Sequence, residues 1–181
     1  VRCGGEGSGS GGGFHEAMVW AGVRKVPLVV VVENNEYAIS VPMRQQMAIE
    51  RVSDRAGGYG VRGVSVDGLD MLASYRAAKE AIDIARAGGG STLLEARVVR
   101  LTPHSSDDND STYRSVEEKA ALKLRDPLPR VRARLIALGA LTEAQALDIE
   151  ERALVEVDAA HRAAEAAPYP ANAWALGPVF A

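Results

Sequence analysis

Apolar residues along the chain follow two different spacings. Residues 27–32 form a short, near-continuous aliphatic run, and two further aliphatic segments lie at residues 61–66 and 92–99. A strand that is aliphatic on both faces suits a parallel sheet, because helices cover both faces of such a sheet. The segment at residues 92–99 alternates apolar with polar side chains, which favours a sheet edge or a strand covered on one face.

Stretches with helical spacing separate these strands. One helix is expected over residues 14–24 and a shorter one over residues 48–56, and Asp70 caps a longer helix that ends at Ala87. The side chains of the longer helix that we expect to face the core are Leu72, Tyr75, Ala78, Ala81, Ile82 and Ala85. Strands that alternate with helices predict an α/β fold with a parallel sheet flanked by helices.

The C-terminal part is predicted to be helical. Capping boxes at residues 115–118 and 142–145 mark two helix starts, and a further helix is expected over residues 127–138. We therefore expect an α/β domain over residues 1–114 and a helical region with an interface tail over residues 115–181. We expect the last helix to dock on the domain or on a partner through a stripe formed by Leu147, Leu154, Val157 and Ala160 or His161, with His161 itself only solvated. The apolar tail, with Trp174, Leu176 and Phe180, is expected to form an interface.

Composition excludes several classes of function. The 181 residues are 47% hydrophobic with a formal net charge of −3, which supplies a core but no basic field for nucleic acid or anionic lipid. Cys3 is the single cysteine, so no internal disulfide can form. No apolar run approaches the ~20 residues of a membrane span. We expect a soluble, cytoplasmic protein that binds neither nucleic acid nor membrane.

Candidate chemistry is concentrated in residues 5–42. Glu6 and Asn35 follow two predicted strands, and loops at the carboxyl ends of neighbouring parallel strands meet at one edge of the sheet. The glycines around Glu6 let backbone N–H groups approach an anion, and a helix follows with its positive end toward the same place. Magnesium prefers a carboxylate with amide and carbonyl oxygens. The stretch is therefore a candidate diphosphate and metal site.

Two other interpretations of this stretch remain open. Residues 9–13 are mostly glycine, and we expect them to form a loose loop, which could be no more than a flexible linker before an ordinary strand. The spacing Gly7-x-Gly9-x-x-Gly12, with Glu33 downstream, also matches a dinucleotide-binding fingerprint. The dinucleotide alternative leaves the segments ENNEYAIS and PHSSDD without an explanation.

The sequence resembles the alpha subunits of thiamin diphosphate-dependent 2-oxo acid dehydrogenases. Their signature is a Gly-acid-Gly that a helix and a strand separate from an Asn-Asn pair, and here it is Gly-Glu-Gly at residues 5–7 and Asn-Asn at residues 34–35. The similarity continues through FHEA, ENNEYAISVP, DRAGGYG, VDGLD and PHSSDDNDSTYR, as far as about residue 139. The resemblance implies the thiamin diphosphate-binding fold with its first part missing, since residues 1–4 match only the end of a strand.

The resemblance also implies roles for individual residues. The magnesium ligands would be Glu6, the amide oxygen of Asn35 and the carbonyl of Tyr37. His104, in the long polar loop over residues 100–114, would be the catalytic residue near the reacting centre and would contact the diphosphate. Ser105 matches a position that a kinase phosphorylates in mitochondrial relatives, but we do not expect that regulation here. The residues implied to bind thiamin diphosphate are Glu6, Gly7, Ser8, Asn35, Ile39 and His104.

The activity implied is oxidative decarboxylation of a branched-chain 2-oxo acid, with transfer of the acyl unit to a lipoyl group. The partners would be a beta subunit, in an alpha2beta2 heterotetramer, and a lipoyl-bearing dihydrolipoyl acyltransferase. The acid Glu6, the AIS after Tyr37 and the HSSDD motif favour the branched-chain type, whereas Glu33 matches pyruvate members. Alternatives are a pyruvate or acetoin dehydrogenase alpha subunit, a Rossmann-type dinucleotide-binding domain, and a catalytically silent assembly fragment.

Overall fold

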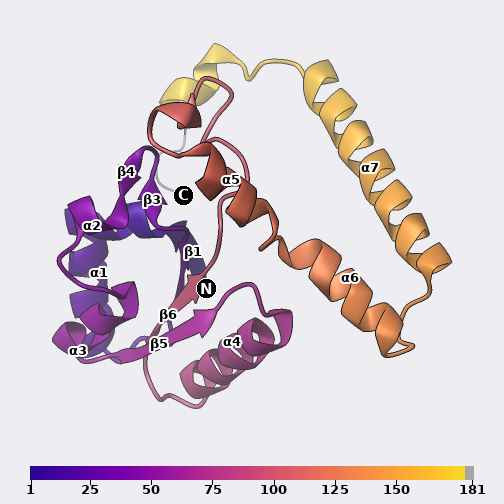
Figure 1. Cartoon of the computed structure of the whole chain (residues 1–181). Coiled ribbons are helices and arrows are strands. Elements are labelled where there is room, and N and C mark those ends of the chain that lie inside the picture. The colour runs from indigo at the N-terminus through magenta and orange to yellow at the C-terminus, as the bar shows by residue number, and fades with distance from the viewer. Residues whose placement is uncertain (178–181) are drawn as a thin grey trace. The chain divides into compact units, whose positions relative to one another are not determined.

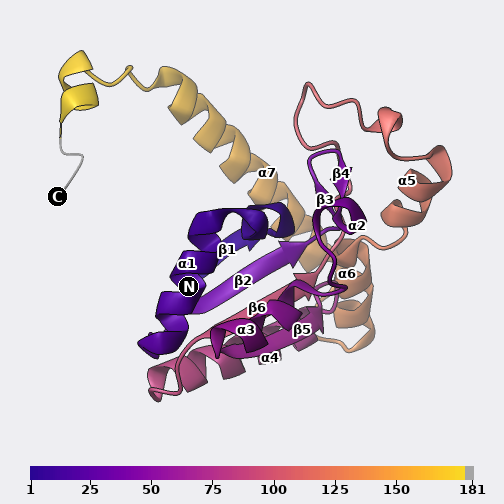
Figure 2. The ribbon, with the colours of Figure 1, turned by 90° about the vertical axis from the view of Figure 1, so that its left-hand side faces the viewer.

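The computed structural model describes residues 1–177 and divides the chain between Val131 and Arg132 into two compact units. The first unit contains a parallel sheet of four strands in the order β1-β2-β6-β5 (Figure 2). This confirms the predicted α/β fold. The strands are β1 (Arg2–Gly5), β2 (Val29–Asn34), β6 (Thr92–Arg97) and β5 (Arg62–Asp67).

Strand β6 lies in the middle of the sheet, between β2 and β5, so the expectation of a sheet edge at residues 92–99 is wrong. Its first four residues are all buried, including Glu95. The Glu95 side chain points into the protein, where Asn34 and Ser53 provide its hydrogen-bond partners. The edges of the sheet are instead formed by β1 and β5.

Helices pack on both faces of the sheet (Figure 1). On one face, Val30 and Val32 join a core with Phe14 and Met18 of α1 (Gly12–Val23). On the other face, Val29 packs with Ala81 and Ala85 of α4 (Met71–Arg86). Successive β2 residues thus serve opposite cores, which explains why the strand is aliphatic throughout.

Two residues expected to face the core from α4 do not. Leu72 and Tyr75 are exposed, whereas Ala81 and Ala85 are buried, so the buried stripe is narrower than predicted. Asp70 caps the helix as expected, and its side chain accepts hydrogen bonds from the N–H groups of Leu72 and Ala73.

The glycine-rich tract is ordered, so the expected loose loop is wrong. Residues Glu6–Ser10 form a 3-10 helix, η1, and α1 begins at Gly12. Arg55 donates a hydrogen bond to the carbonyl of Gly9 (2.6 Å), which ties the tract to a segment far along the chain. A side chain at Gly7 would place its Cβ 2.6 Å from the Cβ of Ala38, so glycine is required there by close approach.

The single helix expected over residues 48–56 is also wrong. The chain instead forms three short pieces, because the buried Val52 and Ser53 are held by the core and by Glu95. Gly60, at φ +68°, ends the last of them in the left-handed region. The pieces are α2 (Met43–Gln46), a 3-10 helix η2 (Val52–Arg55) and α3 (Ala56–Tyr59), preceded by the hairpin β3 (Tyr37–Ala38) and β4 (Val41–Pro42).

The remaining elements follow the helical prediction. Ser115 accepts a hydrogen bond from the N–H of Glu118, and Thr142 forms a full capping box with Gln145. Leu147, Leu154, Val157 and Trp174 are exposed, the side chain of Leu176 is not described, and Phe180 lies outside the described residues. These elements are η3 (Asp110–Thr112), α5 (Val116–Lys123), α6 (Pro127–Ala137), α7 (Glu143–Ala166) and η4 (Asn172–Leu176).

Neither the expected docking of α7 nor the predicted boundary after residue 114 is tested by this arrangement, and both stay predictions. Within residues 1–177, no helix combines the length and the apolar character that a membrane span needs.

The capping box of α7 gives a first testable prediction. Thr142→Ala removes the acceptor for the N–H of Gln145 (3.2 Å), and we expect it to destabilise the start of the helix by about 1 kcal/mol. The measurement is amide hydrogen exchange of residues 143–147, which should become faster. Glu151→Ala, an exposed change within the same helix, should leave that exchange unchanged.

Candidate cofactor and metal site

The candidate site is built where β1 and β2 end. Because these strands are parallel neighbours, with Gly5 paired to Glu33, the residues that follow them lie side by side. Glu6 is only 1% exposed, and its Oε2 accepts a hydrogen bond from the backbone N–H of Asn35 (3.3 Å). Its other oxygen, Oε1, is buried without a hydrogen-bond partner among the described residues. The structure thus brings together two of the predicted ligands.

Burial raises the pKa of the Glu6 carboxyl above its ordinary value. Hydrogen bonds from the backbone of Glu6 and of Asn35, the charge of Arg100 and the nearby side chain of Gln46 act in the opposite direction but are outweighed. A buried carboxylate with one unpaired oxygen is unfavourable unless a cation or a proton occupies that side. The surroundings of Glu6 therefore fit a metal ligand better than a purely structural side chain.

The turn after β2 is held by the two asparagines of the Asn-Asn pair. The Oδ1 of Asn34 accepts from the N–H of Glu36 (2.9 Å), and the Oδ1 of Asn35 accepts from the N–H of Tyr37 (3.2 Å). Such turns suit asparagine, whose side chain mimics a backbone carbonyl. Glu36 has φ +69°, a left-handed conformation that a non-glycine residue adopts at a cost and that these hydrogen bonds help to hold.

The hairpin β3–β4 brings the next residues against the glycine-rich tract. Ala38 touches Gly7 so closely that any larger residue at position 7 would displace it. Ile39, implied to bind cofactor, is exposed at φ +57°, and the hydroxyl of Ser8 donates to the carbonyl of Gly5 (2.7 Å). Gly7, Ser8 and Ile39 thus lie on two loops in contact with each other, although their binding role stays a prediction.

A buried polar network that the sequence patterns did not predict lies behind this turn. Glu95 on β6 accepts hydrogen bonds from Nδ2 of Asn34 (2.7 Å), from the N–H of Ser53 (3.2 Å) and from the Ser53 hydroxyl (3.0 Å). The available signal was the glutamate within the otherwise apolar run TLLEA. A carboxylate in the middle of a buried strand needs several donors, and they come from residues distant in sequence.

Aromatic and basic side chains connect Tyr37 to the loop after β6. The Tyr37 hydroxyl donates to Glu118 (3.1 Å), and the buried Arg114 lies over the Tyr37 ring, 4.7 Å from its centroid. Arg114 also donates to the carbonyl of Arg100 (2.9 Å), and Arg100 donates to the hydroxyl of Tyr113 (2.8 Å). Burial, and then Glu118, raise the pKa of Tyr37, which keeps its hydroxyl a donor.

His104 is not brought to Glu6 or Asn35 by the contacts of the structure. It is exposed, and its backbone N–H donates a hydrogen bond to Asp108 (2.8 Å). The same Asp108 oxygen accepts from the Tyr113 hydroxyl (2.5 Å), and this bond lowers the pKa of Asp108. The loop is therefore anchored at its far end, and the catalytic role of His104 stays a prediction.

Comparison with known proteins adds the decisive observation. The dehydrogenase E1 component family matches residues 1–173 of the chain. The chain belongs to this family. Among its relatives, the 2-oxoisovalerate dehydrogenase subunit alpha of Bacillus subtilis (strain 168) is 48% identical over 177 residues, which cover 98% of this chain and 54% of that protein.

Two further relatives carry a different name. The pyruvate dehydrogenase E1 component subunit alpha of Staphylococcus aureus (strain Mu50 / ATCC 700699) is 40% identical, with 89% of this chain and 44% of that protein covered. The protein of the same name from Acholeplasma laidlawii is 38% identical, with 93% and 48% covered. The chain thus spans about half the length of the curated relatives that it matches. Membership of the E1 family displaces the dinucleotide-binding alternative.

The oxygen atoms near Glu6 in this E1 chain determine which metal ion could bind there. Within residues 1–177, no three His, Cys, Asp or Glu side chains cluster as a metal site. A metal beside Glu6 would therefore depend on one carboxylate together with amide, carbonyl and phosphate oxygens. That donor set is the one magnesium accepts when it binds a diphosphate, and the unpaired Glu6 oxygen fits it.

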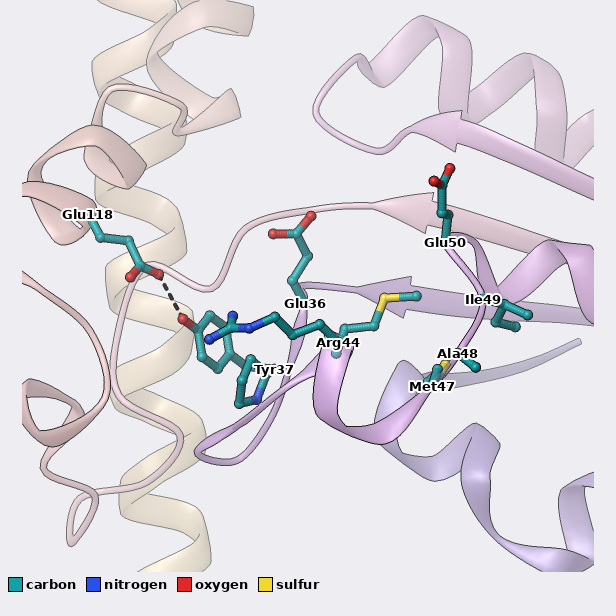
Figure 3. A pocket seen from close by; sticks show the side chains of 10 residues that line it. Glu36, Tyr37, Arg44, Met47, Ala48, Ile49, Glu50 and Glu118 are labelled. Carbon is teal, nitrogen blue, oxygen red and sulfur yellow. Dashed lines mark hydrogen bonds between the residues drawn. The ribbon is translucent and has the colours of Figure 1, made fainter.

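A separate cavity of about 650 Å³ lies beside the turn of the E1 chain (Figure 3). Its lining includes Tyr37 but neither Glu6 nor Asn35. In Figure 3, Tyr37 and Glu118 are joined at one end of the drawn set, and Ile49 and Glu50 lie at the other. The cavity combines apolar side chains with three carboxylates and one arginine, so it does not have the chemistry of a diphosphate site.

Proposed function

We propose that the chain is part of the alpha subunit of a thiamin diphosphate-dependent 2-oxo acid dehydrogenase, with branched-chain 2-oxo acids preferred over pyruvate. The observation that carries the proposal is the buried Glu6 carboxylate, whose one oxygen has no hydrogen-bond partner among residues 1–177 and whose other oxygen accepts from the N–H of Asn35 at the carboxyl edge of the sheet. Membership of the dehydrogenase E1 component family supports it.

In this function the residues of the chain bind and orient a cofactor. Glu6, the amide oxygen of Asn35 and the carbonyl of Tyr37 would hold Mg²⁺, and the metal would neutralise the diphosphate. The glycine-rich tract around Gly7 and Ser8 would approach the diphosphate closely because it lacks bulky side chains. His104 would contact the same diphosphate from its loop.

When bound, thiamin diphosphate supplies a thiazolium carbon that adds to the 2-oxo group, so that carbon dioxide can leave and the acyl unit can pass to a lipoyl group. The chain itself supplies position and electrostatics, as is usual for cofactor enzymes. We propose that a beta subunit supplies the remaining contacts and that a lipoyl-bearing acyltransferase receives the acyl unit.

The substrate preference rests on sequence similarity. Identity is 48% to a relative named for 2-oxoisovalerate and 40% to one named for pyruvate. An apolar pocket separates substrates that differ by one methylene by only about 1–3 kcal/mol, so small changes in its wall decide the preference. The check is the ratio of kcat/KM values for 2-oxoisovalerate and pyruvate in the full-length assembly, and a ratio that favours pyruvate tenfold would overturn the preference.

Cofactor binding is tested with Asn35→Ala in the full-length alpha-beta assembly. Removing the amide oxygen takes away one metal ligand and one hydrogen bond of the turn, so we expect the Kd for thiamin diphosphate with Mg²⁺ to rise at least about 100-fold. Isothermal titration calorimetry measures it, with the exposed Asn172→Ala as control. Association with the beta subunit without cofactor binding by the parent would instead support a silent assembly fragment.

A further inference from the structure

Glu95 is the most deeply buried carboxylate near the turn, yet it contacts neither Glu6 nor Asn35. It is 0% exposed, in the middle of the central strand β6. Its Oε1 accepts from Asn34, and its Oε2 accepts from both donors of Ser53. Both oxygens are therefore occupied by groups of the chain, unlike those of Glu6, so Glu95 has the chemistry of an organising residue and not of a ligand.

Asn34 links Glu95 to the turn, because its amide forms hydrogen bonds with both. Its Nδ2 donates to Glu95 (2.7 Å) and also contacts the sulfur of Met43 (3.2 Å), so the amide nitrogen faces the interior. An amide held in this way must point its oxygen the other way, and Oδ1 indeed accepts from the N–H of Glu36 (2.9 Å). That bond closes the turn in which Glu36 has φ +69°.

The contact is strong enough to fix the amide. Burial acts to raise the pKa of Glu95, but hydrogen bonds from Asn34 and Ser53 outweigh burial and leave the pKa below its ordinary value. Glu95 is therefore ionised at neutral pH, and hydrogen bonds to an ionised acceptor are about twice as strong as those between neutral groups. A flipped Asn34 amide would place its oxygen against this carboxylate, which is repulsive.

We propose that Glu95 is a positioning residue that fixes the amide orientation of Asn34 and thereby shapes the turn over residues 35–37, which presents the metal-binding oxygens of Asn35 and Tyr37. The last step rests on the proposed function, whereas the first two concern the chain alone. Glu95 does not touch metal or cofactor. It acts through Asn34, one strand away from the site.

The first test needs no cofactor. Glu95→Gln removes the charge and leaves one acceptor oxygen for the donors of both Asn34 and Ser53, so the hydrogen bond that fixes the Asn34 amide is lost or weakened to that of a neutral acceptor. We expect amide hydrogen exchange of residues 36 and 37 in the full-length polypeptide to become at least about tenfold faster, as expected when a hydrogen bond of the turn is lost. Exchange in β1 and α4 should not change. Unchanged exchange at residues 36 and 37 would overturn the proposal.

The second test is a double-mutant cycle on metal binding, with Mn²⁺ as a paramagnetic probe in the presence of thiamin diphosphate. Glu95→Gln and Asn34→Ala should each weaken Mn²⁺ binding at least about tenfold, and the double variant should be no weaker than Asn34→Ala alone. Additive losses would show that Glu95 acts by another route. If Glu95→Gln does not assemble, Glu95→Asp takes its place, since it keeps the charge but withdraws it by one carbon.

Two controls separate positioning from general stability. Leu93→Val perturbs the same buried strand without touching Asn34, and Ser53→Ala removes only the hydroxyl on the other Glu95 oxygen. Both should lower Tm and leave Mn²⁺ affinity within about twofold at temperatures well below Tm. A parent that binds no Mn²⁺ contradicts the proposed function, and hydrogen exchange then still decides the role of Glu95.

Discussion

Replacing Glu6 with glutamine should strongly weaken binding of a divalent metal and make the metal-free protein more stable at neutral pH. The variant has no carboxylate to offer a cation, so we expect the affinity for Mg²⁺ with thiamin diphosphate to fall at least about 100-fold. Stability should rise because the variant no longer buries an ionisable group whose Oε1 has no partner in the described part of the chain.

The pH dependence of stability follows from the raised pKa of Glu6. The folded protein holds this proton more tightly than the unfolded chain does, so the stability of the metal-free parent falls as pH rises from the ordinary carboxyl pKa through the raised folded pKa. Glu6→Gln removes that loss. Its advantage in Tm should therefore be present at pH 8 and shrink toward about pH 3, where the parent carboxyl is protonated in both states.

Thermal unfolding followed by circular dichroism, with and without Mg²⁺ and thiamin diphosphate, checks both effects. Glu16→Gln, an exposed change on α1, serves as control and should change neither metal affinity nor the pH profile. Metal affinity unchanged in Glu6→Gln would contradict the assignment of Glu6 as a ligand. A lower Tm for the metal-free variant would show that the charge of Glu6 is satisfied in the folded protein.

Gly22→Ala should produce the largest loss of stability among small substitutions. A Cβ on Gly22 would lie 2.0 Å from the carbonyl oxygen of Tyr59, so α1 and the end of α3 would have to separate. Because the opposing atom belongs to the backbone and cannot rotate away, we expect a loss of about 3 kcal/mol, at the upper end of the range for overpacking.

The matched control for this change is Gly57→Ala. Gly57 is also a helical glycine, but no atom of the described residues outside its own helix and its chain neighbours lies within 4 Å of the place where its Cβ would be. Alanine favours helix by about 1 kcal/mol over glycine, so this variant should be neutral or slightly stabilised. Urea unfolding measures both. Equal stability of the two variants would show that the close approach of α1 and α3 is not maintained in solution.

The central geometry of the site could be predicted from sequence because it depends on topology alone. Glu6 and Asn35 each follow a strand, and neighbouring parallel strands deliver such residues to one edge whatever the loops between them do. The structure confirms this adjacency through the hydrogen bond between them. The helix caps at Asp70 and Thr142 could also be predicted from the sequence, since the side chain and its backbone partner lie within one helical turn.

The errors have a different physical origin. The helix expected over residues 48–56 is broken because Ser53 gives its N–H to Glu95, and Glu95 in turn made β6 look half exposed. Avoiding either error would have required knowledge of a partner far along the chain, which the local spacing of apolar residues does not contain. The glycine-rich tract was judged by propensity alone, although Arg55 and Ala38 hold it in place.

The contact between Gly7 and Ala38 also bears on how the protein can change over generations. The two positions lie on separate loops but share one small space, in which a Cβ at position 7 would meet the Ala38 Cβ at 2.6 Å. A side chain at position 7 is therefore expected to be tolerated only after position 38 has become glycine. A residue larger than alanine at position 38 would prevent any substitution of Gly7. The two loops are thus expected to accept mutations in a fixed order.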